Sequence, residues 1–436
     1  MLKNKKVAFH TFGCKVNYAE TSAVVHSLIK QGATTSSNVK DADILIINTC
    51  TVTHRADADA RKFIRSAIRT NPNLFVIVMG CASEVNPQMF QQIEGVDLIV
   101  GQQKMDLVNI LQNDTNLVKT SPRIVTPQDA CSEENLKFDL AYSGENDART
   151  RAFLKIQDGC EYKCSYCIIP QARGKFRSMK FDAILSTIRE LESKGYLEIV
   201  LVGINLSEYF DEGKTFLDVI KLINDADLKA RIRISSIEPN VLNREIINEF
   251  VDSKNLCDHF HIPLQSGSDK ILKLMRRRYN TNKFLEKIHL INELLPNAGI
   301  GFDVITGFPG ETDKEFDETY NFLNNIHFSY LHVFSYSERK NTVAEKLPNK
   351  VDEQIKKQRT QKLIELSQKK HLDFALSQIN REHLFIAETR KSDGYLYGHT
   401  SNYLEVALDE AKEKYESIIK IKLISLINGI ILSKKV

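Results

Sequence analysis

The stretch Cys160-Glu161-Tyr162-Lys163-Cys164-Ser165-Tyr166-Cys167 decides how the rest of the chain is interpreted. Three thiols at the spacing C-x3-C-x2-C cannot share one face of a strand, whose faces repeat every 2 residues, although the spacing matches one face of a helix, which repeats every 3.6 residues. We interpret the segment as a loop wrapped around a shared ligand. A tetrahedral zinc site needs a fourth ligand, and ferredoxin-type sequences supply four cysteines per cluster. Three thiols without a local fourth favour a 4Fe–4S cluster with one open iron, and zinc remains the alternative.

Composition and charge exclude several classes of protein. The 436 residues suffice for two or three domains, and 42% hydrophobic with 26% charged residues is typical of soluble proteins. A net charge of +3 does not by itself indicate a nucleic-acid-binding protein. No apolar run is long enough to span a bilayer, and the N-terminus runs into a strand without a signal peptide, so we expect a cytoplasmic protein without a membrane partner. Eight cysteines are too sparse for a disulfide framework and indicate metal ligands or buried thiols.

The first hundred residues repeat the pattern of a βαβ unit. Apolar strands that do not alternate with polar residues indicate a parallel sheet covered on both faces by helices. The expected strands are 6–9, 43–47, 74–79 and 97–100, and the expected helices are 19–31 and 53–70.

Three further cysteines follow the first three of these strands. Cys14, Cys50 and Cys81 stand just after successive strands, with Gly13 and Gly80 next to two of them. The carboxyl ends of parallel strands meet at one edge of the sheet, so we expect these thiols to lie close together. Glycine suits a close approach of the backbone to a bulky ligand. The pattern favours a second three-thiolate cluster, and three unrelated buried thiols are the alternative.

A second βα pattern begins after a polar linker that spans residues 113–148 and contains Cys131, to which we assign no role. Six strand–helix repeats are too few for a closed eight-stranded barrel and predict a partial barrel with its functional loops at the carboxyl ends of the strands. The expected strands are 152–156, 198–202, 231–235, 259–262, 301–305 and 330–334, and the expected helices are 181–194, 216–224, 242–251, 269–275, 282–295 and 313–325.

The C-terminal part changes to short strands after a helix over 351–379. Expected strands at 383–389, 395–399, 403–408 and 418–431, the last in one or two pieces, predict a small all-β barrel. Tyr395, His399 and Tyr403 suit stacking on unpaired bases, with a purely structural barrel as the alternative. Arg276, Arg277 and Arg278 suit phosphate binding, or else the C-terminal end of a helix.

Several of these motifs together resemble the radical S-adenosylmethionine (SAM) methylthiotransferase family. The resemblance rests on KIQDGCEYKCSYCIIPQARGKFRS around the first thiols, on GCKVN, NTCTVT and MGC in the N-terminal part, on HIPLQSGS with MRRRY, and on RKSDGYLYGHTSNYLEVAL, which resembles the TRAM domain of RNA-modifying enzymes. It implies an α/β chain with five parts: a Rossmann-like cluster domain over 1–112, the linker over 113–148, a partial (β/α)6 radical SAM barrel over 149–350, a connecting helix over 351–380 and a TRAM-like barrel over 381–436.

The resemblance also implies the cofactors. Two 4Fe–4S clusters would be held by Cys14, Cys50 and Cys81 and by Cys160, Cys164 and Cys167. Loops at the carboxyl ends of the barrel strands would bind SAM through hydroxyl, amide and carboxylate groups, a glycine turn and a ring packed on adenine. The residues expected there are Tyr166, Gly203, Asn205, Ser236, Glu238, Gln265 and Gly307.

The implied reaction uses SAM twice. One molecule would methylate sulfur at the N-terminal cluster, and another would be cleaved by one-electron reduction at the second cluster, whose 5′-deoxyadenosyl radical would abstract hydrogen from an unactivated aromatic C–H bond. Such a bond has no acidic proton, so the chemistry needs a radical cofactor while the protein orients the substrate and excludes water. Both open irons would face one substrate, which predicts that the N-terminal sheet edge caps the barrel mouth.

Resemblance to one branch within the family indicates the substrate. GCKVN, VGINL and GHTSNY resemble the branch that modifies C2 of N6-threonylcarbamoyladenosine in the tRNA anticodon loop. The branches acting on isopentenyladenosine, or on an aspartate of a small-subunit ribosomal protein, share the six cysteines and stay as alternatives. A non-catalytic iron–sulfur RNA-binding protein or an electron carrier is the alternative from another class. We further expect a monomer and a reductant such as flavodoxin or ferredoxin.

Overall fold

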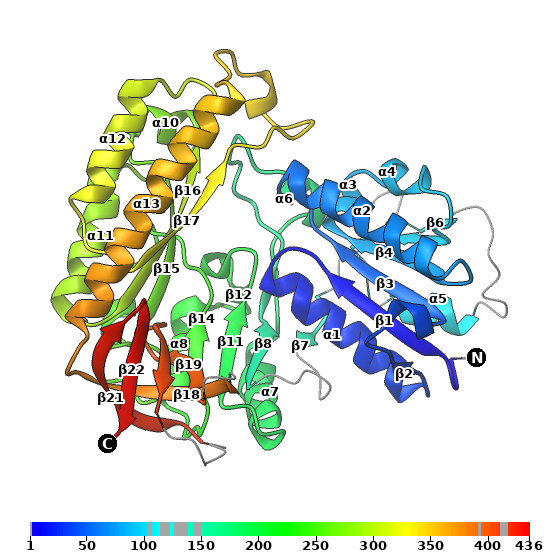
Figure 1. Cartoon of the computed structure of the whole chain (residues 1–436), viewed down its shortest axis with the longest axis horizontal. Coiled ribbons are helices and arrows are strands. Elements are labelled where there is room, and N and C mark those ends of the chain that lie inside the picture. Colours follow the sequence, from blue (N-terminus) through cyan, green and yellow to red (C-terminus); the bar gives the residue numbers. More distant parts are fainter. Residues whose placement is uncertain are drawn as a thin grey trace.

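The computed structural model describes residues 2–102, 104, 106–113, 123–125, 138–142, 150–390, 394–409 and 417–436. Cys131 and most of the predicted linker lie outside these residues. Three bodies follow each other along the chain: an α/β domain, a partial barrel and a small β-barrel (Figure 1). Among the described helices, none is both long and apolar enough to cross a membrane.

The N-terminal domain is a six-stranded sheet with the order β2-β1-β3-β4-β5-β6, in which every pairing is parallel. All residues of β3 and β4 are buried because separate apolar clusters pack on the two faces of the sheet. The strands are β1 (Lys6–Thr11), β2 (Thr34–Thr35), β3 (Ile44–Thr49), β4 (Phe75–Gly80), β5 (Leu98–Val100) and β6 (Arg123–Val125), and the helices are α1 (Lys15–Lys30), α2 (His54–Thr70), α3 (Cys81–Val85), α4 (Gln88–Gln91) and α5 (Asp106–Asn113), with a 3-10 turn η1 (Val39–Asp41).

Two features of this part differ from the sequence-based prediction. The first helix begins at Lys15, directly after Cys14, and not at Ala19, because the polar Asn17 is satisfied within the fold by carbonyl groups of Phe12 and Thr49. The linker also contributes strands: β6 completes the N-terminal sheet, and β7 (Ala141–Tyr142) pairs antiparallel with the first barrel strand. Such short strands among polar residues leave no periodic signal in the sequence.

The central domain confirms the predicted partial barrel of six parallel strands. It consists of the sheets β14-β11-β8-β7 and β15-β16-β17, and contacts between them include a bridge from Ile232 to Leu256 and a backbone hydrogen bond from Ile237 to His261 (3.0 Å). Its strands are β8 (Arg151–Lys155), β11 (Glu198–Val202), β14 (Arg231–Ile234), β15 (His259–Gln265), β16 (Gly299–Thr306) and β17 (Tyr330–Ser335), and its helices are α6 (Ile169–Arg173), α7 (Phe181–Ser193), α8 (Phe216–Asn224), α9 (Arg244–Asn248), α10 (Asp269–Leu274), α11 (Thr281–Leu294) and α12 (Asp313–Asn324).

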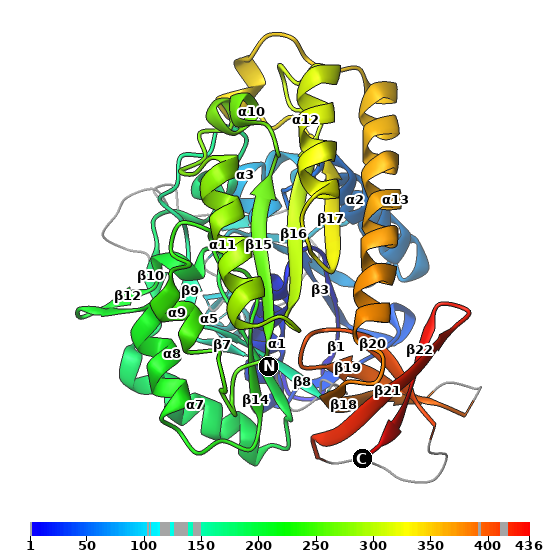
Figure 2. The ribbon, with the colours of Figure 1, turned by 90° about the vertical axis from the view of Figure 1, so that its left-hand side faces the viewer.

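Several smaller elements flank the barrel, and one long helix packs along its last strand. Two short hairpins pair β9 (Gln157–Asp158) with β10 (Arg177–Ser178) and β12 (Phe210–Asp211) with β13 (Lys214–Thr215). The 3-10 turns η2 (Leu206–Glu208) and η3 (Ala344–Lys346) lie in loops. Helix α13 (Glu353–Ser377) runs along β17 next to α12 and leads to the C-terminal barrel (Figure 2).

The C-terminal barrel is closed by five strands in the order β18-β19-β20-β22-β21. Its strands are β18 (Glu382–Arg390), β19 (Leu396–Thr400), β20 (Glu405–Leu408), β21 (Ile419–Ile427) and β22 (Ile430–Lys435), so the predicted last strand is two strands. The barrel docks on the amino-terminal ends of the central strands, where Arg231 donates to the carbonyl of Leu384 (2.9 Å) and Arg233 to that of Ser401 (2.8 Å). It therefore lies at the end of the central barrel opposite to the Cys160–Cys167 loop.

Candidate active site

The Cys160–Cys167 loop connects β9 to α6 and is fixed to its surroundings through its backbone. Ser165 is its anchor: its N–H donates to the carbonyl of Met275 (3.0 Å), its hydroxyl to that of Leu274 (2.7 Å), and its carbonyl accepts from Ala344 (2.7 Å). The N–H of Cys160 donates to the carbonyl of Gly174 (3.1 Å). With the central residue of the loop held from both sides, the three thiols project from a fixed frame.

Nitrogen donors approach two of these thiols. A guanidinium N–H of Arg277 points at Cys164 Sγ (3.1 Å), and the backbone N–H of Tyr162 points at Cys160 Sγ (3.4 Å). Glu238 holds Arg277 in place through an ion pair. Donors of this kind stabilise sulfur that carries negative charge, as a metal-bound thiolate does. Burial raises the pKa of the Cys167 thiol to about 12, so metal binding there displaces a proton.

The three thiols open onto a cavity of about 780 Å³. Among its described lining residues there is no fourth cysteine and no histidine. The residues therefore fit a cluster held by three thiolates with one iron left for an exogenous ligand. Basic side chains on the walls give the cavity a positive charge, and they are Lys163, Lys175, Arg177 and Arg276.

Gly159 shapes the start of the loop and provides a test of it. Its φ is +70°, and a Cβ at this position would lie 1.9 Å from the carbonyl oxygen of Lys175. We expect Gly159→Ala to displace the backbone beside Cys160, because left-handed strain of about 1–3 kcal/mol is joined by a backbone clash. The matched control is Gly195→Ala, where φ is +88° and nothing lies within 4 Å of the added Cβ.

The measurement is iron content after anaerobic reconstitution, together with the midpoint of thermal unfolding. Gly159→Ala should lose about half of the bound iron or more, because the loop would hold one of the two expected clusters, whereas Gly195→Ala should keep its iron and unfold only slightly earlier. Equal iron content in the two variants would show that the loop tolerates a side chain there.

The second cysteine set lies at the carboxyl edge of the N-terminal sheet, as predicted. Cys14 caps α1, Cys50 follows β3 and Cys81 begins α3 after β4. A Cβ on Gly13 would lie 2.7 Å from Cys50 Cβ, so the loop that carries Cys14 touches Cys50. Burial first, and then the neighbouring Cys81 and Cys14 thiols, raise the pKa of Cys50 to about 12. The three thiols are thus electrostatic neighbours despite their separation in sequence.

Two nitrogen donors from different domains point at Cys81. Gln102 Nε2 and Arg173 Nε each lie 3.3 Å from its sulfur. Gln102 belongs to the N-terminal domain, but Arg173 is the last residue of α6, which follows the Cys160–Cys167 loop. The two cysteine sets are therefore connected through a single short helix. The two nitrogen donors and the three neighbouring thiols fit a second iron–sulfur cluster, whose thiolates would carry negative charge.

Arg173 is also the centre of a buried charge network between the domains. It donates to Glu20 (3.0 Å) and Asn17 (2.7 Å) of α1 and to Asp158 of β9 (2.8 Å). Lys155 of β8 bridges the same two carboxylates. Burial alone raises the pKa of Glu20, but the charges of Arg173, Lys104 and Lys155 outweigh it and hold this pKa well below its usual range. These residues were missed at the level of sequence, although Arg173 and Asp158 stand in the motif around the thiols.

A second cavity, of about 240 Å³, lies between the Cys160–Cys167 loop and the segment that follows Cys50. It is bounded by Cys167 and Tyr166 on one side, by Val52 and Thr53, just after Cys50, on another, and by barrel residues that include Gln265 and Asp303. The N-terminal domain closes it from outside: Asp57 pairs with Arg339 (2.6 Å), and the N–H of His54 donates to Ser337 Oγ (3.0 Å). The expected capping of the barrel mouth is thus present.

Most of the residues expected to bind SAM gather at this end of the barrel. Asn205 N–H bonds to Gln157 (2.8 Å) beside Gly203, and its amide lies 3.8 Å from Cys160 Sγ. Glu238 pairs with Arg277, which contacts Cys164, Ser236 lies just after β14, and Gln265 lines the second cavity. Tyr166 is packed edge-on against Phe308.

Gly307 is the exception among them. A Cβ there would lie 2.2 Å from Lys356 Cγ, so this glycine makes room for α13 and faces away from both cavities. Its conformation (φ +71°) and its N–H, which donates to Glu311 (2.7 Å), complete a turn. We therefore do not retain Gly307 as a cofactor-binding residue, because a glycine required for helix packing gives the same sequence signal.

The structure places the arginines expected to contact RNA in different environments. Arg276 is exposed and lines the first cavity, and Arg278 is exposed and lies over the ring of Tyr162 (3.6 Å). Arg277 has a side chain only 3% exposed and is engaged with Cys164 and Glu238, so it is not retained as an RNA contact.

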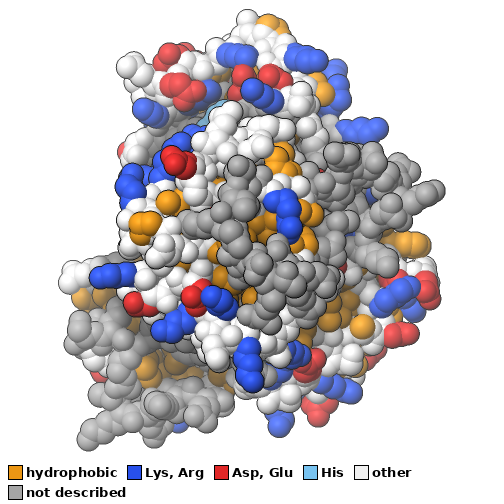
Figure 3. All heavy atoms as spheres, turned by 90° about the vertical axis from the view of Figure 1, so that its right-hand side faces the viewer, with side chains coloured by type: hydrophobic (Ala, Val, Ile, Leu, Met, Phe, Trp, Pro, Cys, Tyr) orange, Lys and Arg blue, Asp and Glu red, His pale blue; other side chains and the backbone are white. Residues whose placement is uncertain are grey.

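The aromatic residues of the C-terminal barrel divide in the same way. Tyr395 is half-buried. The rings of His399 and Tyr403 stack on each other (4.9 Å), and Tyr403 lies under Arg233 of the central barrel (4.9 Å). These two rings belong to the interface between the barrels, and we do not retain them as stacking platforms. On the N-terminal face, as far as the structure describes it, acidic and basic side chains are scattered without a continuous basic surface (Figure 3).

Comparison with known proteins supports the class that the loop and the fold define. The family model "Radical SAM superfamily" matches residues 154–323, and the model "Uncharacterized protein family UPF0004" matches residues 6–101. A radical SAM methyltransferase from Kitasatospora setae, solved with tryptophan and a SAM analogue, has a TM-score of 0.56 at 13% identity and covers 76% of this chain and 73% of its own. The chain therefore has the fold of a radical SAM enzyme.

The relatives narrow this class. "Threonylcarbamoyladenosine tRNA methylthiotransferase" of Bacillus subtilis is 37% identical over 428 residues, which cover 96% of this chain and 93% of that protein. "tRNA-2-methylthio-N(6)-dimethylallyladenosine synthase" of Christiangramia forsetii is 29% identical and covers 96% and 91%. The chain belongs to the radical SAM methylthiotransferase family, and the resemblance read from its motifs is confirmed. Membership implies SAM and a 4Fe–4S cluster as cofactors.

Proposed function

We propose that this enzyme inserts a methylthio group at C2 of N6-threonylcarbamoyladenosine next to the anticodon of tRNA. The observation that carries the proposal is the likeness, over nearly the whole chain, to the Bacillus subtilis threonylcarbamoyladenosine tRNA methylthiotransferase. The likeness to the dimethylallyladenosine synthase is lower in identity over a similar length. The isopentenyl branch is therefore the second candidate.

Two clusters divide the work in this proposal. Cys160, Cys164 and Cys167 hold the cluster at the barrel mouth, and Cys14, Cys50 and Cys81 hold a second 4Fe–4S cluster on the N-terminal domain. When bound, these clusters supply the electron that cleaves SAM and the sulfur that is transferred. The substrate base occupies the cavity between them, which Cys167 lines and which Val52 and Thr53 reach from the other side.

The protein's own residues bind and orient SAM and the substrate base and shield them from water. Asn205, beside Cys160, and Gln265, in the second cavity, offer amide groups to SAM and the base. Arg277 and Arg173 direct N–H groups at one thiol of each set and so fix the sulfur positions. The ion pair between Asp57 and Arg339 holds the N-terminal domain over the cavity, which keeps water from a reactive radical.

The anticodon loop enters, on this proposal, through the open first cavity. Its basic walls suit phosphates, and a target base must leave its stack to reach a buried site. The C-terminal barrel lies at the far end, so it contacts another part of the tRNA. The protein would act as a monomer and receive electrons from a flavodoxin or ferredoxin.

The test is mass spectrometry of nucleosides from tRNA incubated anaerobically with reconstituted protein, SAM and a reductant. The substrates are tRNAs that carry threonylcarbamoyladenosine, isopentenyladenosine or unmodified adenosine at the position beside the anticodon. A methylthio increment on threonylcarbamoyladenosine alone is the expected result. An increment on isopentenyladenosine alone would support the second candidate.

Two other outcomes point elsewhere. SAM cleavage without modification of any nucleoside would direct the search to the aspartate of the small-subunit ribosomal protein. No SAM cleavage at all would favour a non-catalytic iron–sulfur protein that binds RNA.

A further inference from the structure

The interior of the central barrel below the second cavity is unusually polar. The strand register places His261, Gly301 and Tyr330 side by side in one layer, and Pro263, Asp303 and His332 in the next layer toward the cavity. A barrel core is normally filled with branched apolar side chains. Gly301 lets the ring of Tyr330 lie across the sheet, because a Cβ there would lie 2.1 Å from that ring. This lumen, defined by these six residues, is built for a polar group.

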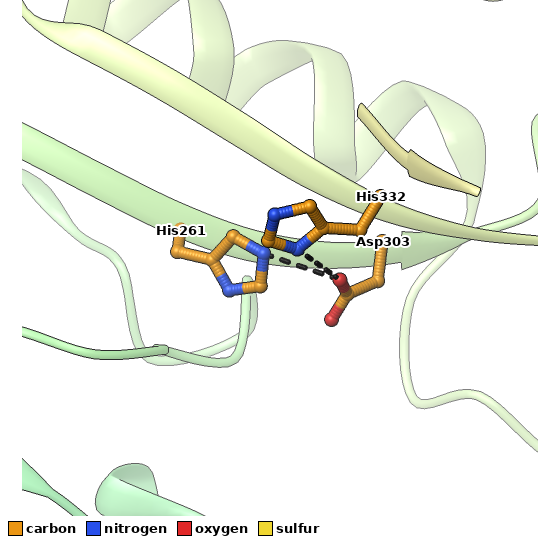
Figure 4. Close-up of side chains that lie close together, drawn as sticks. All are labelled: His261, Asp303 and His332. Carbon is orange, nitrogen blue, oxygen red and sulfur yellow. Dashed lines mark hydrogen bonds and ion pairs between the residues drawn. The ribbon is translucent and has the colours of Figure 1, made fainter. Parts of the chain in front are cut away.

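Asp303 is the acceptor at the top of the lumen and also lines the second cavity. Its Oδ1 lies 3.2 Å from His261 Nε2 and 3.3 Å from His332 Nδ1 (Figure 4). Burial would raise the pKa of Asp303, but its close contacts with both imidazoles hold this pKa below its usual range, so the carboxylate is charged. None of the described residues donates to its Oδ2, which leaves that oxygen to accept hydrogen bonds from a ligand.

Lys15 is a cation near the lower end of the lumen. It is the first residue of α1 and lies close enough to Arg233, Tyr403 and His259 for their charges to interact. Its ammonium has no ion pair or hydrogen bond with any of the residues that the structure describes. The neighbouring cations are occupied: Arg233 pairs with Glu198 (2.8 Å) and Arg151 with Glu388 (3.1 Å). A partly buried cation without a partner is costly unless a ligand supplies the opposite charge.

We propose that this lumen binds the threonylcarbamoyl side chain of the substrate, with Lys15 holding its carboxylate at the lower end and Asp303, beside His332, accepting from its N–H or hydroxyl groups at the top. The inference rests on the proposed function. The group carries one carboxylate, one hydroxyl and ureido N–H donors, and each finds a complement on the walls. Successive layers are about 7 Å apart along the strands, which a side chain of this length spans.

The same chemistry excludes the isopentenyl group. An apolar chain in this lumen would remove Lys15, Asp303 and the imidazoles from water without giving them partners. Sites built to hydrogen-bond a substrate reject analogues that lack those groups by factors up to about 10⁴–10⁵. The lumen would thereby select one branch of substrates within the family.

The experiment removes the charge from the substrate and from the enzyme separately. Carbodiimide coupling to methylamine converts the threonyl carboxylate of purified tRNA into a neutral amide. For the wild-type holoenzyme we expect kcat/KM to fall by roughly 10- to 100-fold on the amidated tRNA, since a charge-assisted hydrogen bond is lost. For Lys15→Gln we expect a similar fall on untreated tRNA and less than about a twofold further effect of amidation.

Control variants distinguish a loss of substrate recognition from damage to the fold or to the clusters. Lys15→Arg keeps the charge and should retain most of the activity and the sensitivity to amidation, and Lys30→Gln, at the other end of α1, should behave as wild type. Because Lys15 adjoins Cys14, iron content and SAM cleavage are measured in every variant. His332→Gln, which changes the upper layer beside Asp303, should lower activity but keep the sensitivity to amidation.

The outcomes are distinguishable. A wild-type enzyme inactive on untreated threonylcarbamoyladenosine tRNA contradicts the proposed function itself. If the wild type is active and equally active on amidated tRNA, only the inference is overturned. The same holds if amidation lowers kcat/KM of Lys15→Gln by the same factor as it lowers that of the wild type. Stoichiometric zinc in the holoenzyme that is lost in Asp303→Asn would assign His261, Asp303 and His332 to a metal ion, since two imidazoles and a carboxylate also suit zinc, and would overturn it as well.

Discussion

Replacing Cys160 by alanine is expected to abolish both the cleavage of SAM and methylthio transfer, whereas Cys50→Ala is expected to keep cleavage and lose only the transfer. Cys160 belongs to the loop at the barrel mouth, and Cys50 lies at the edge of the N-terminal sheet. Each set of three thiols has its own nitrogen donors, so the loss of one thiol leaves the other set intact. The loss of function in each case should reach the limit of detection, because a cluster with three protein ligands does not tolerate removal of one.

The measurement is the amount of 5′-deoxyadenosine and of methylthio nucleoside formed in the same anaerobic reaction, normalised to iron content. Cys257→Ala is the control, because Cys257 is a buried thiol like Cys50 but lies beside Arg233 and Glu198 at the opposite end of the barrel. It should retain both products. Loss of SAM cleavage in Cys50→Ala, with the other cluster still bound, would contradict the division of labour.

Arg173→Met is expected to separate the N-terminal domain from the barrel. Methionine has a similar length to arginine but carries no charge. Glu20 and Asp158 would then face each other in a buried position with less compensating positive charge. Breaking a buried ion-pair network by removing one partner costs about 3–5 kcal/mol. It also removes the donor to Cys81, so the N-terminal cluster should be lost first.

Thermal unfolding and iron content measure this effect, and Arg55→Met is the control, since its ion pair with Asp59 is exposed and worth less than about 1 kcal/mol. The pH dependence gives a second test. In the wild type the lowered pKa of Glu20 stabilises the fold above the ordinary carboxyl pKa, and this contribution is lost as the pH falls toward the lowered value. In Arg173→Met that contribution is smaller, so the gap between the proteins should narrow in acid. A gap that is small at neutral pH would contradict the structural role of Arg173.

Local patterns carried much of the architecture. Unalternated apolar runs such as that at 43–47 predicted the parallel strands, and the position of Cys14, Cys50 and Cys81 after three of them predicted a shared site because strand ends of a parallel sheet coincide. The Cys160–Cys167 spacing indicated three thiols gathered on one ligand. In each case a short local pattern, combined with a general rule of packing, predicts where the residues lie in the fold.

The remaining features depend on partners that are distant in sequence. Arg173 meets Glu20, which precedes it by 153 positions, and nothing in either neighbourhood reveals the pairing. Arg277 in a run of three arginines is the buried one, because its side chain turns inward to Cys164 while Arg276, at φ +57°, stays outside. His399 and Tyr403 have the composition of an RNA surface but form a domain interface, since composition does not specify which face is covered.

The central claim is that both cysteine sets serve one substrate between them, and the magnetic interaction of two reduced clusters tests it most directly. Electron paramagnetic resonance spectra are recorded for the reduced wild type and for the Cys50→Ala and Cys160→Ala variants, each of which keeps one cluster. Clusters that flank the cavity lined by Cys167, Val52 and Thr53 should couple, so the wild-type spectrum should be broadened and should relax faster than the sum of the two single-cluster spectra. A wild-type spectrum equal to that sum would place the clusters too far apart to share a substrate and would contradict the account.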